Sequence, residues 1–413
     1  MEAIVLDGNE RSALAVTRSL GIKRIKVTVG ADVSPSLSAS SRYCGGSFLY
    51  PSPQKDPDKF FNKVVQYTKK ENGVVLFPMT DVTLSEILRR KEEFGKSIVI
   101  PFENYAKYIQ VSDKSKLFQL ARSLNIPIPK TYASSDYHGN IIPIEVLSGV
   151  EYPLVIKPCF SRIRTDNGVI STGVRYARDA DELKTVLSSD FFRNFPFLIQ
   201  ERIQGPGVGI FLLMKDGKVL AKFAHRRIRE KPPSGGVSVL CESISPPVEA
   251  LRAATEILGE LRWSGVAMVE FKHDEKENVP KLIEINARFW GSLQLAVTSG
   301  VDFPYMLFQM ATGESVEEPW EYRIGVQSRW ELGDLDNLLI RLMKKSSTLS
   351  LPESHPSRAV VAKDFIMDIF RPFVFNEILR KDDPKPFFYE LREYIKNIIS
   401  VRVGNDPKTT VQP

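Results

Sequence analysis

Apolar and polar positions alternate between two periods along the first hundred residues. Short apolar runs that fit strands fall at 3–8, 23–32, 73–79 and 96–102. Segments with apolar residues at helical spacing fall between them, at 9–21, 56–73 and 82–95. Strands that alternate with helices predict a mostly parallel sheet. The first strand ends in Asp7-Gly8-Asn9 and carries no GxGxxG run, so the sequence offers no dinucleotide fingerprint there.

Beyond residue 111 the pattern changes to strands in antiparallel hairpins. A capped helix over 111–124 begins at Ser112 or Asp113, and strands are expected at 152–158 and 197–203. Asp216-Gly217 marks the turn of a hairpin over 210–230. A helix over 247–261 precedes a second hairpin that starts at residue 265. The segment after residue 325 is mainly helical in pattern, with a break at 351–357.

Composition and charge narrow the class of protein. The 413 residues are too many for one ordinary domain and suit two or three packed subdomains. No apolar run approaches the ~20 residues of a membrane span, and the acidic start MEAIVLDGNE does not resemble a signal peptide, so we expect a cytoplasmic protein. The net charge of +6 is spread along the chain, which favours small anions over nucleic acid as partners. Three widely spaced cysteines and four scattered histidines argue against zinc and disulfides.

The hairpin that starts at residue 265 carries the most informative chemistry. Two apolar runs, VAMVEF and KLIEIN, each contain an acid, so pairing of the two strands would place Glu270, Glu284 and Asn286 side by side. Hard oxygen ligands on one sheet face suit Mg²⁺ that shares its shell with phosphate oxygens. Arg288 continues the same face and suits a phosphate or a carboxylate. The alternative is solvated acids at strand ends, but carboxylates within apolar runs favour a cation nearby.

Two lysines are candidates for binding a triphosphate. Lys157 stands at the end of the apolar strand PLVIKP, where a cation needs an anion. Lys114 lies in the first turn of a helix, whose dipole already favours anions. Taken alone, Lys114 is better explained as an ordinary surface lysine of a helix.

The strand FLIQERI offers a backbone edge that could bind an adenine. The strand ends in Gln200, Glu201, Arg202 and Ile203, of which Glu201 could accept a hydrogen bond from a ribose hydroxyl or from the base. The glycine run at 205–209 lacks the strand-to-helix context of a phosphate loop, and it is interpreted as a tight turn.

Two further segments concentrate cations. The segment with His225 and Arg226 precedes Ser234, Gly235 and Gly236, which would let the backbone approach a substrate closely. Arg162 and Arg164 lie in an irregular stretch after Lys157, where arginines would suit a lid over phosphates. A solvated loop explains the first segment equally well, and exposure to solvent is the usual explanation of charged loop residues such as Arg162 and Arg164.

Taken in order, these motifs resemble the ATP-grasp superfamily. The chain has Asp113-Lys114, then IKP with Lys157, then QERI, then VEF with Glu270, and finally EINAR with Glu284, Asn286 and Arg288. Carbamoyl-phosphate synthase large subunits, biotin carboxylases and D-alanine–D-alanine ligases share that order. The run that begins EINARFWGSLQLAVTSGVDFPY, together with HRRIREKPPSGGVSV, looks closer to carboxylate–amine ligase-like proteins. The resemblance covers about residues 1–325.

The resemblance implies an α/β pre-ATP-grasp domain (1–111) followed by two α+β lobes (112–198 and 199–325), with a mainly helical C-terminal extension at 326–413. It implies that Lys114 and Lys157 contact the nucleotide, that residues 200–203 bind adenine, and that Glu270, Glu284 and Asn286 hold one or two Mg²⁺, with Mn²⁺ as a substitute. Arg288 and Lys157 would act at the transferred phosphoryl group. The stretch after Lys157 holds only Gly168 and Gly173, fewer glycines than in many relatives, which leaves the phosphate lid unassigned.

The implied reaction is ATP-dependent coupling of a small-molecule carboxylate to an amine through an acyl phosphate. A phosphotransfer step without an amine acceptor and a non-catalytic nucleotide-binding protein remain as alternatives. The substrates and the oligomeric state do not follow from the motifs, although dimers are common among relatives and a homodimer fits the resemblance.

Overall fold

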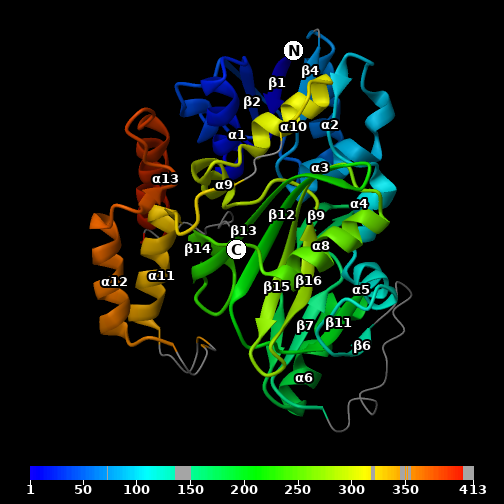
Figure 1. The fold of residues 1–413 in the computed structure, drawn as a ribbon, viewed down its shortest axis with the longest axis vertical. Helices are drawn as coiled ribbons and strands as arrows, with labels where there is room; N and C mark the ends of the chain where they lie inside the picture. Colours follow the sequence, from blue (N-terminus) through cyan, green and yellow to red (C-terminus); the bar gives the residue numbers. More distant parts are fainter. Residues whose placement is uncertain are drawn as a thin grey trace.

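The computed structural model describes residues 1–71, 73–134, 150–317, 321–344, 349, 351 and 355–402. Figure 1 shows three sheets stacked along the long axis, with the N-terminal sheet at one end and the C-terminal helices along one side. None of the helices within these ranges is long and apolar enough to cross a membrane.

The N-terminal domain is built on a five-stranded sheet of order β3-β2-β1-β4-β5, and all its pairs are parallel, which confirms the predicted α/β architecture. Its strands are β1 (Glu2–Val5), β2 (Val27–Ala31), β3 (Gly46–Leu49), β4 (Val74–Phe77) and β5 (Ile98–Val99). Its helices are α1 (Arg11–Ile22), η1 (Ser38–Ser40), α2 (Pro57–Thr68), α3 (Asp81–Arg89), η2 (Lys91–Glu93) and α4 (Tyr105–Ser112). The carboxyl ends of parallel strands meet at one edge, so Asp7 after β1 and Asp81 after β4 face the same side. The Asp7 carboxylate accepts hydrogen bonds of 2.9 Å from the backbone N–H groups of Met79 and Thr80, which ties the two strand ends together.

The next lobe is a four-stranded antiparallel sheet of order β10-β7-β11-β6. It contains α5 (Lys114–Ser123), β6 (Thr131–Ser134), β7 (Leu154–Pro158), β10 (Arg175–Ala177), α6 (Ala180–Leu187), α7 (Asp190–Asn194) and β11 (Phe197–Glu201). A separate two-stranded hairpin, β8 (Arg162–Thr165) and β9 (Gly168–Ser171), leaves this lobe directly after β7. The lobe has its own small apolar core around Leu154, Ile156 and Phe197.

The third sheet has seven strands in the order β16-β15-β12-β13-β14-β17-β18. Its main elements are β12 (Gly207–Lys215), β13 (Lys218–Lys231), β14 (Val237–Ser243), α8 (Val248–Glu260), β15 (Gly265–Asp274), β16 (Val279–Asn286), α9 (Leu293–Ser299) and α10 (Phe303–Thr312). Asp216 and Gly217 both have positive φ, as a tight hairpin turn requires, and confirm the predicted β12–β13 hairpin. The glycine run at 205–209 is not a single tight turn, because Gly207 and Gly209 lie inside β12.

The C-terminal extension is mainly helical, as expected, but it also completes the third sheet. It comprises β17 (Gln327–Arg329), α11 (Glu331–Met343), α12 (Arg358–Phe370), β18 (Val374–Asn376) and α13 (Lys385–Arg402). Strand β17 pairs with β14, and β18 lies parallel to β17 at the sheet edge. The sequence pattern misses both strands, since three residues are too few for a recognisable alternation. The extension is therefore continuous with the lobe that carries the acidic hairpin.

Candidate functional site

The β15–β16 hairpin brings the predicted acidic residues together. Glu270 and Glu284 are direct register partners, and Asn286 is opposite Met268. Partners in a ladder point to the same face, so both carboxylates stand side by side on this sheet. The Asn286 side chain donates a 3.2 Å hydrogen bond to Glu284 Oε1, which places the amide oxygen and both acids in one cluster.

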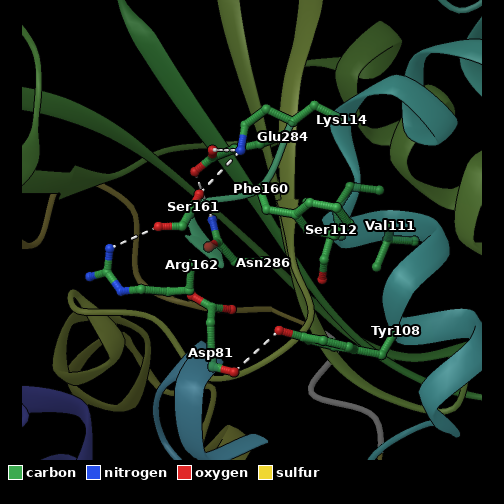
Figure 2. Close-up of a pocket in the computed structure, with 11 residues that line it drawn as sticks. Asp81, Tyr108, Val111, Ser112, Lys114, Phe160, Ser161, Arg162, Glu284 and Asn286 are labelled. Carbon is green, nitrogen blue, oxygen red and sulfur yellow. Dashed lines mark hydrogen bonds and ion pairs between the residues drawn. The ribbon is translucent and has the colours of Figure 1, made fainter. Parts of the chain in front are cut away.

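Two lysines from the neighbouring lobe approach this cluster. Lys114 is buried at the start of α5, where its Nζ lies 3.6 Å from Glu284 Oε2 and donates a 3.1 Å hydrogen bond to Ser161 Oγ (Figure 2). Burial alone would raise the pKa of Glu284, but the charges of Lys114 and Lys157 outweigh burial and lower it. Desolvation lowers the pKa of Lys157 to about 8, against an opposing effect of Glu284. The two lysines and the carboxylate thus form one electrostatic unit.

The N-terminal domain closes the site from the other side. Asp81, at the start of α3, lines the same pocket as Lys114, Ser161 and Glu284 (Figure 2). Its carboxylate accepts a 2.7 Å hydrogen bond from Arg288 Nη2, and its carbonyl oxygen accepts a 3.3 Å bond from the Tyr108 hydroxyl. Burial would raise the pKa of Asp81, but Arg288 outweighs burial and lowers it. The sequence reasoning missed Asp81, although its position at the carboxyl end of a parallel strand is a usual place for a ligand site.

Arg288 therefore connects two domains next to the carboxylates. Its guanidinium also donates to the Phe289 carbonyl oxygen at 2.8 Å and to Asn286 Oδ1 at 3.3 Å. The Nε atom is buried and has no hydrogen-bond partner among the described residues. A buried donor without a partner is costly, so this position suits an anionic ligand.

Comparisons with known proteins agree with this architecture. Residues 193–332 match a family model described as an ATP-grasp in the biosynthetic pathway with Ter operon. The biotin carboxylase domain of the Hydrogenobacter thermophilus 2-oxoglutarate carboxylase superposes with a TM-score of 0.60 at 16% identity, over 79% of this chain and 73% of that chain. The chain has the ATP-grasp fold.

Two other solved structures match over the same share of the chain. The L-amino acid ligase from Bacillus licheniformis gives a TM-score of 0.59 at 18% identity, over 79% of this chain and 78% of that chain. The N5-carboxyaminoimidazole synthetase from Staphylococcus aureus gives 0.59 at 13% identity, over 79% and 80% respectively. At such identities the likeness concerns the fold and not the reaction. A search of curated proteins found no match.

In this structure Glu270 is already paired with a protein cation. Arg227 on β13 reaches over the bare backbone of Gly207, and its Nη2 lies 2.5 Å from Glu270 Oε2. The same guanidinium contacts Glu230 at 2.9 Å and the Gly236 carbonyl oxygen at 3.2 Å. Burial would raise the pKa of Glu270, and it remains raised despite Arg227. A metal that binds Glu270 must therefore use the other carboxylate oxygen or displace Arg227, which also contacts Glu230 and Gly236.

Successive residues of β13 point to opposite faces of the sheet, so the side chains of the cationic segment lie on different faces. His225 and Arg227 point to the face that carries Glu270, whereas Arg226 points to the other face, where it pairs with Glu242 at 2.6 Å. His225 is buried over Gly209, and its Nε2 has no partner among the described residues. The sequence pattern singled out Arg226 and overlooked Arg227, although the period of two along this strand already separates them. Gly236 touches Arg227 through its carbonyl oxygen, while no contact of Ser234 or Gly235 with the acidic cluster is seen in this part of the structure.

Residues 200–203, the predicted adenine-binding hinge, already make several contacts within the protein. Gln200 is buried and donates a 3.0 Å hydrogen bond to Thr131 Oγ1, and its Oε1 has no partner among the described residues. The Glu201 carboxylate instead accepts hydrogen bonds from the Lys130 backbone N–H at 2.8 Å and from Lys281 Nζ at 2.9 Å. The Arg202 guanidinium lies 5.4 Å from the centre of the Tyr176 ring, and Ile203 is buried in the core. Gln200 is thus the hinge side chain that keeps a free acceptor.

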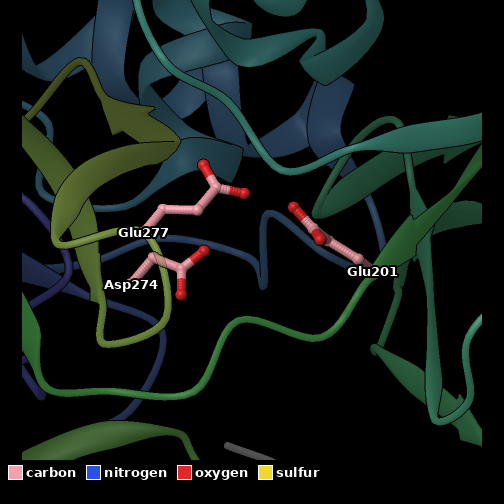
Figure 3. Close-up of side chains that lie close together, drawn as sticks. All are labelled: Glu201, Asp274 and Glu277. Atoms are coloured by element: carbon pink, nitrogen blue, oxygen red, sulfur yellow. The ribbon is translucent and has the colours of Figure 1, made fainter.

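Glu201 belongs to a second acidic cluster, with Asp274 and Glu277 (Figure 3). All three carboxylates surround Lys281 Nζ, which lies 2.9, 2.8 and 2.8 Å from Glu201, Asp274 and Glu277 respectively. Burial alone would lower the pKa of Lys281, but the three acids raise it well above its ordinary value. The lysine ammonium supplies the positive charge that a metal would bring, so this cluster joins strands β11 and β16 instead of binding a cation.

The two predicted lid arginines face different ways on the β8–β9 hairpin. Arg162 lines the pocket and donates a 3.0 Å hydrogen bond to the Ser161 carbonyl oxygen (Figure 2). Arg164 instead contacts Glu86 at 2.5 Å and Asp58 at 3.0 Å, both in the N-terminal domain. The Val169 N–H also donates to the Gln54 carbonyl oxygen at 2.7 Å. Arg164 therefore anchors the hairpin to the N-terminal domain, and Arg162 is left as the cation over the pocket.

We expect Glu284→Gln to leave the fold intact and to lower Mg·ATP turnover by on the order of 10²–10³, because the site loses one of its two carboxylates. Steady-state ADP release and a thermal unfolding scan measure the two effects. The matched control is Glu277→Gln, which removes an acid from the Lys281 cluster and should retain turnover. Unchanged turnover in Glu284→Gln would remove Glu284 from the metal site.

Affinity for Mg·ATP should depend on pH through Lys157. Below pH 8 the ammonium of the free protein is protonated, so affinity should be flat. Above pH 8 binding must take up a proton, so Kd should rise by up to about tenfold per pH unit. Calorimetric titration between pH 7 and 9.5 measures this slope. Lys157→Arg stays charged throughout and should give a flat profile; an equally flat profile in the unmodified protein would contradict the assignment.

Proposed function

We propose that this chain is an ATP-dependent ligase that activates a carboxylate as an acyl phosphate and couples it to an amine or a similar nucleophile. The observation that carries the proposal is the meeting of Glu270, Glu284, Asn286 and Arg288 with Lys114 and Asp81, which three parts of the chain contribute. A site that only bound a neutral ligand would not need this density of opposite charges. The likeness to the amino acid ligase and the carboxyaminoimidazole synthetase supports the same class of reaction through the shared fold.

We propose that the nucleotide binds where a hydrogen-bond acceptor has no protein partner and where cations can contact phosphate oxygens. The unpartnered Gln200 Oε1 in the hinge can accept a hydrogen bond from an adenine amino group. Lys114 and Arg162 line the pocket, and the charge of Lys157 acts on Glu284 at its border, so the three cations can offset the charge of a triphosphate. We therefore place the base near β11 and the phosphates between α5 and the acidic hairpin.

The donor set of the hairpin fits a hard divalent cation. Two carboxylates and one amide oxygen are ligands that Mg²⁺ prefers, with water and phosphate oxygens completing its shell. We propose that Glu270, Glu284 and Asn286 hold one or two Mg²⁺, or Mn²⁺ in its place. The ion would supply charge neutralisation of the transferred phosphoryl group. Arg227, released from Glu270, would remain beside the site on Glu230 and the Gly236 carbonyl oxygen.

The reaction itself needs no covalent enzyme nucleophile. A carboxylate oxygen of the substrate attacks the γ-phosphorus of ATP, the bond to the β-phosphate oxygen breaks, and ADP leaves. The amine nitrogen then attacks the acyl carbon, inorganic phosphate leaves, and the proton lost by the amine passes to solvent. Lys157 and Arg288 stabilise the negative charge that moves between oxygens in these steps. Asp81 holds Arg288 in place from the N-terminal domain.

The decisive experiment measures ADP release, the mass of the product and the transfer of a carboxylate oxygen to phosphate. The protein is incubated with Mg·ATP and with pools of carboxylates, of amines, or of both, and ADP release is measured before mass spectrometry of the products. The account predicts ADP release that requires both pools, with a new mass equal to carboxylate plus amine minus water. With ¹⁸O-labelled carboxylate, one ¹⁸O should appear in the released phosphate. Glu284→Gln should release no ADP above background.

Two outcomes would contradict the proposal. ADP release that requires a carboxylate but no amine, with an acyl phosphate trapped by hydroxylamine, would indicate a phosphotransferase. Tight binding of ATP without any turnover across the pools would indicate a nucleotide-binding protein.

A further inference from the structure

Apolar side chains are concentrated on the surface of the C-terminal extension. Of the 25 large apolar residues that are exposed in the described ranges, 15 lie between Leu339 and Ile399. Single exposed apolar residues are normal on a soluble protein, but a group of this size within one segment marks an interaction surface.

Helix α12 carries the centre of this group. Its inward side holds Val361 and Asp368, which are buried. Its outward side carries the apolar residues Val360, Ile366, Met367, Ile369 and Phe370, and the exposed charged residues of the helix are Arg358 and Lys363. A helix that is apolar on both sides is normally buried on both sides. In Figure 1 α12 lies at the margin of the molecule, beside α11.

The inward contacts fix α12 firmly, so its outward face is not a product of loose docking. Asp368 accepts hydrogen bonds of 2.6 Å from both Arg229 on β13 and Arg371. Arg229 also binds Asp334 on α11 through two hydrogen bonds, of 2.7 and 2.8 Å. Asp334 and Asp368 are thus turned inward and neutralised, so neither acid places a charge on the outward face.

The apolar face continues past the end of the helix onto the sheet edge. Phe370 and Phe373 are 76% and 72% exposed, and Phe375 lies on β18, the last strand of the seven-stranded sheet. We define the α12 face as the exposed residues Val360, Ile366, Met367, Ile369, Phe370, Phe373 and Phe375. Its three phenylalanines alone expose roughly 300–450 Å². With the four aliphatic residues the face reaches roughly 700 Å², close to the ~800 Å² that each partner buries in a stable dimer.

We propose that the α12 face binds the same face of a second copy of this chain about a two-fold axis near Ile366. Three features favour this occupant. An apolar helix face can pack against the same face of a second copy, as a two-fold contact requires. The outer edge of β18 adjoins the face and can be covered by the partner. A lipid surface would instead favour a helix whose opposite face is cationic and solvated, whereas the opposite face of α12 is packed and carries Asp368.

The contact would also bear on the site, although the proposal does not depend on the proposed function. Arg229 lies two residues from Arg227 on the same strand, and it is held by Asp368 of α12, the helix whose outer surface is the proposed interface. A dimer would therefore stiffen the wall that carries the counter-ion of Glu270.

Sedimentation equilibrium of the full chain between about 1 and 50 μM tests the proposal. The unmodified protein should sediment with twice the chain mass of 46.6 kDa. Ile366→Asp and Phe370→Asp should each weaken dimerisation by at least about 100-fold while circular dichroism and ATP binding stay unchanged. The matched control is Val248→Asp, which places the same charge on an 81% exposed apolar position of α8 outside the face and should leave the dimer intact.

A second variant keeps the test valid if the aspartate variants fail to fold. Ile366→Cys, close to the axis, should form an intermolecular disulfide under mild oxidation, whereas Val248→Cys should not. Three results would overturn the assignment of a second copy. The unmodified protein could be a monomer at 50 μM, or its dimer could survive both aspartate substitutions. It could also be a monomer that binds vesicles of phosphatidylcholine and phosphatidylglycerol.

Discussion

The structure depends on how two adjacent carboxylates are neutralised. Glu270 and Glu284 face each other across the β15–β16 ladder, where like charges repel and burial strengthens the repulsion. Each acid is balanced by a cation from another element: Arg227 on β13 serves Glu270, and Lys114 on α5 serves Glu284. Two adjacent carboxylates on one sheet face are costly, and metal binding would explain their presence. In that account a metal and its nucleotide replace the protein cations at Glu270 and Glu284.

The same requirement explains why separate parts of the chain converge on one place. The N-terminal domain contributes Asp81, which holds Arg288 beside Asn286. The β8–β9 hairpin is anchored to that domain through Arg164, so Arg162 can face the pocket. The C-terminal extension holds β13 from behind through Arg229. The site is therefore positioned by ion pairs between domains as well as by the apolar cores within them.

Much of the fold followed from the sequence because its elements obey simple periods. The alternating strands and helices of the first hundred residues, the Asp216-Gly217 turn and the acidic hairpin all appear where the pattern places them. The hairpin register was predictable, since two apolar runs around one short turn allow few pairings.

The rest depended on contacts that no local pattern contains. Glu201 was a candidate ribose contact, but in the structure it belongs to an ion cluster around Lys281, which lies far along the chain from it. Arg227 is distinguished from Arg226 only by the face of the strand on which it lies. Asp81 joined the site through the packing of one domain on another, and β17 and β18 were too short to show a period. The roles of the individual residues in catalysis remain predictions.

Direct measurement of divalent-metal binding tests the central claim, that Glu270 and Glu284 exchange protein cations for a metal. Electron paramagnetic resonance of free Mn²⁺ during titration with protein and a non-hydrolysable ATP analogue gives the affinity without turnover. The account predicts saturable binding in the unmodified protein, its loss in Glu270→Gln, and tighter binding in Arg227→Gln, because a competing cation has been removed. Equal Mn²⁺ affinity in the unmodified protein and in Glu270→Gln would contradict it.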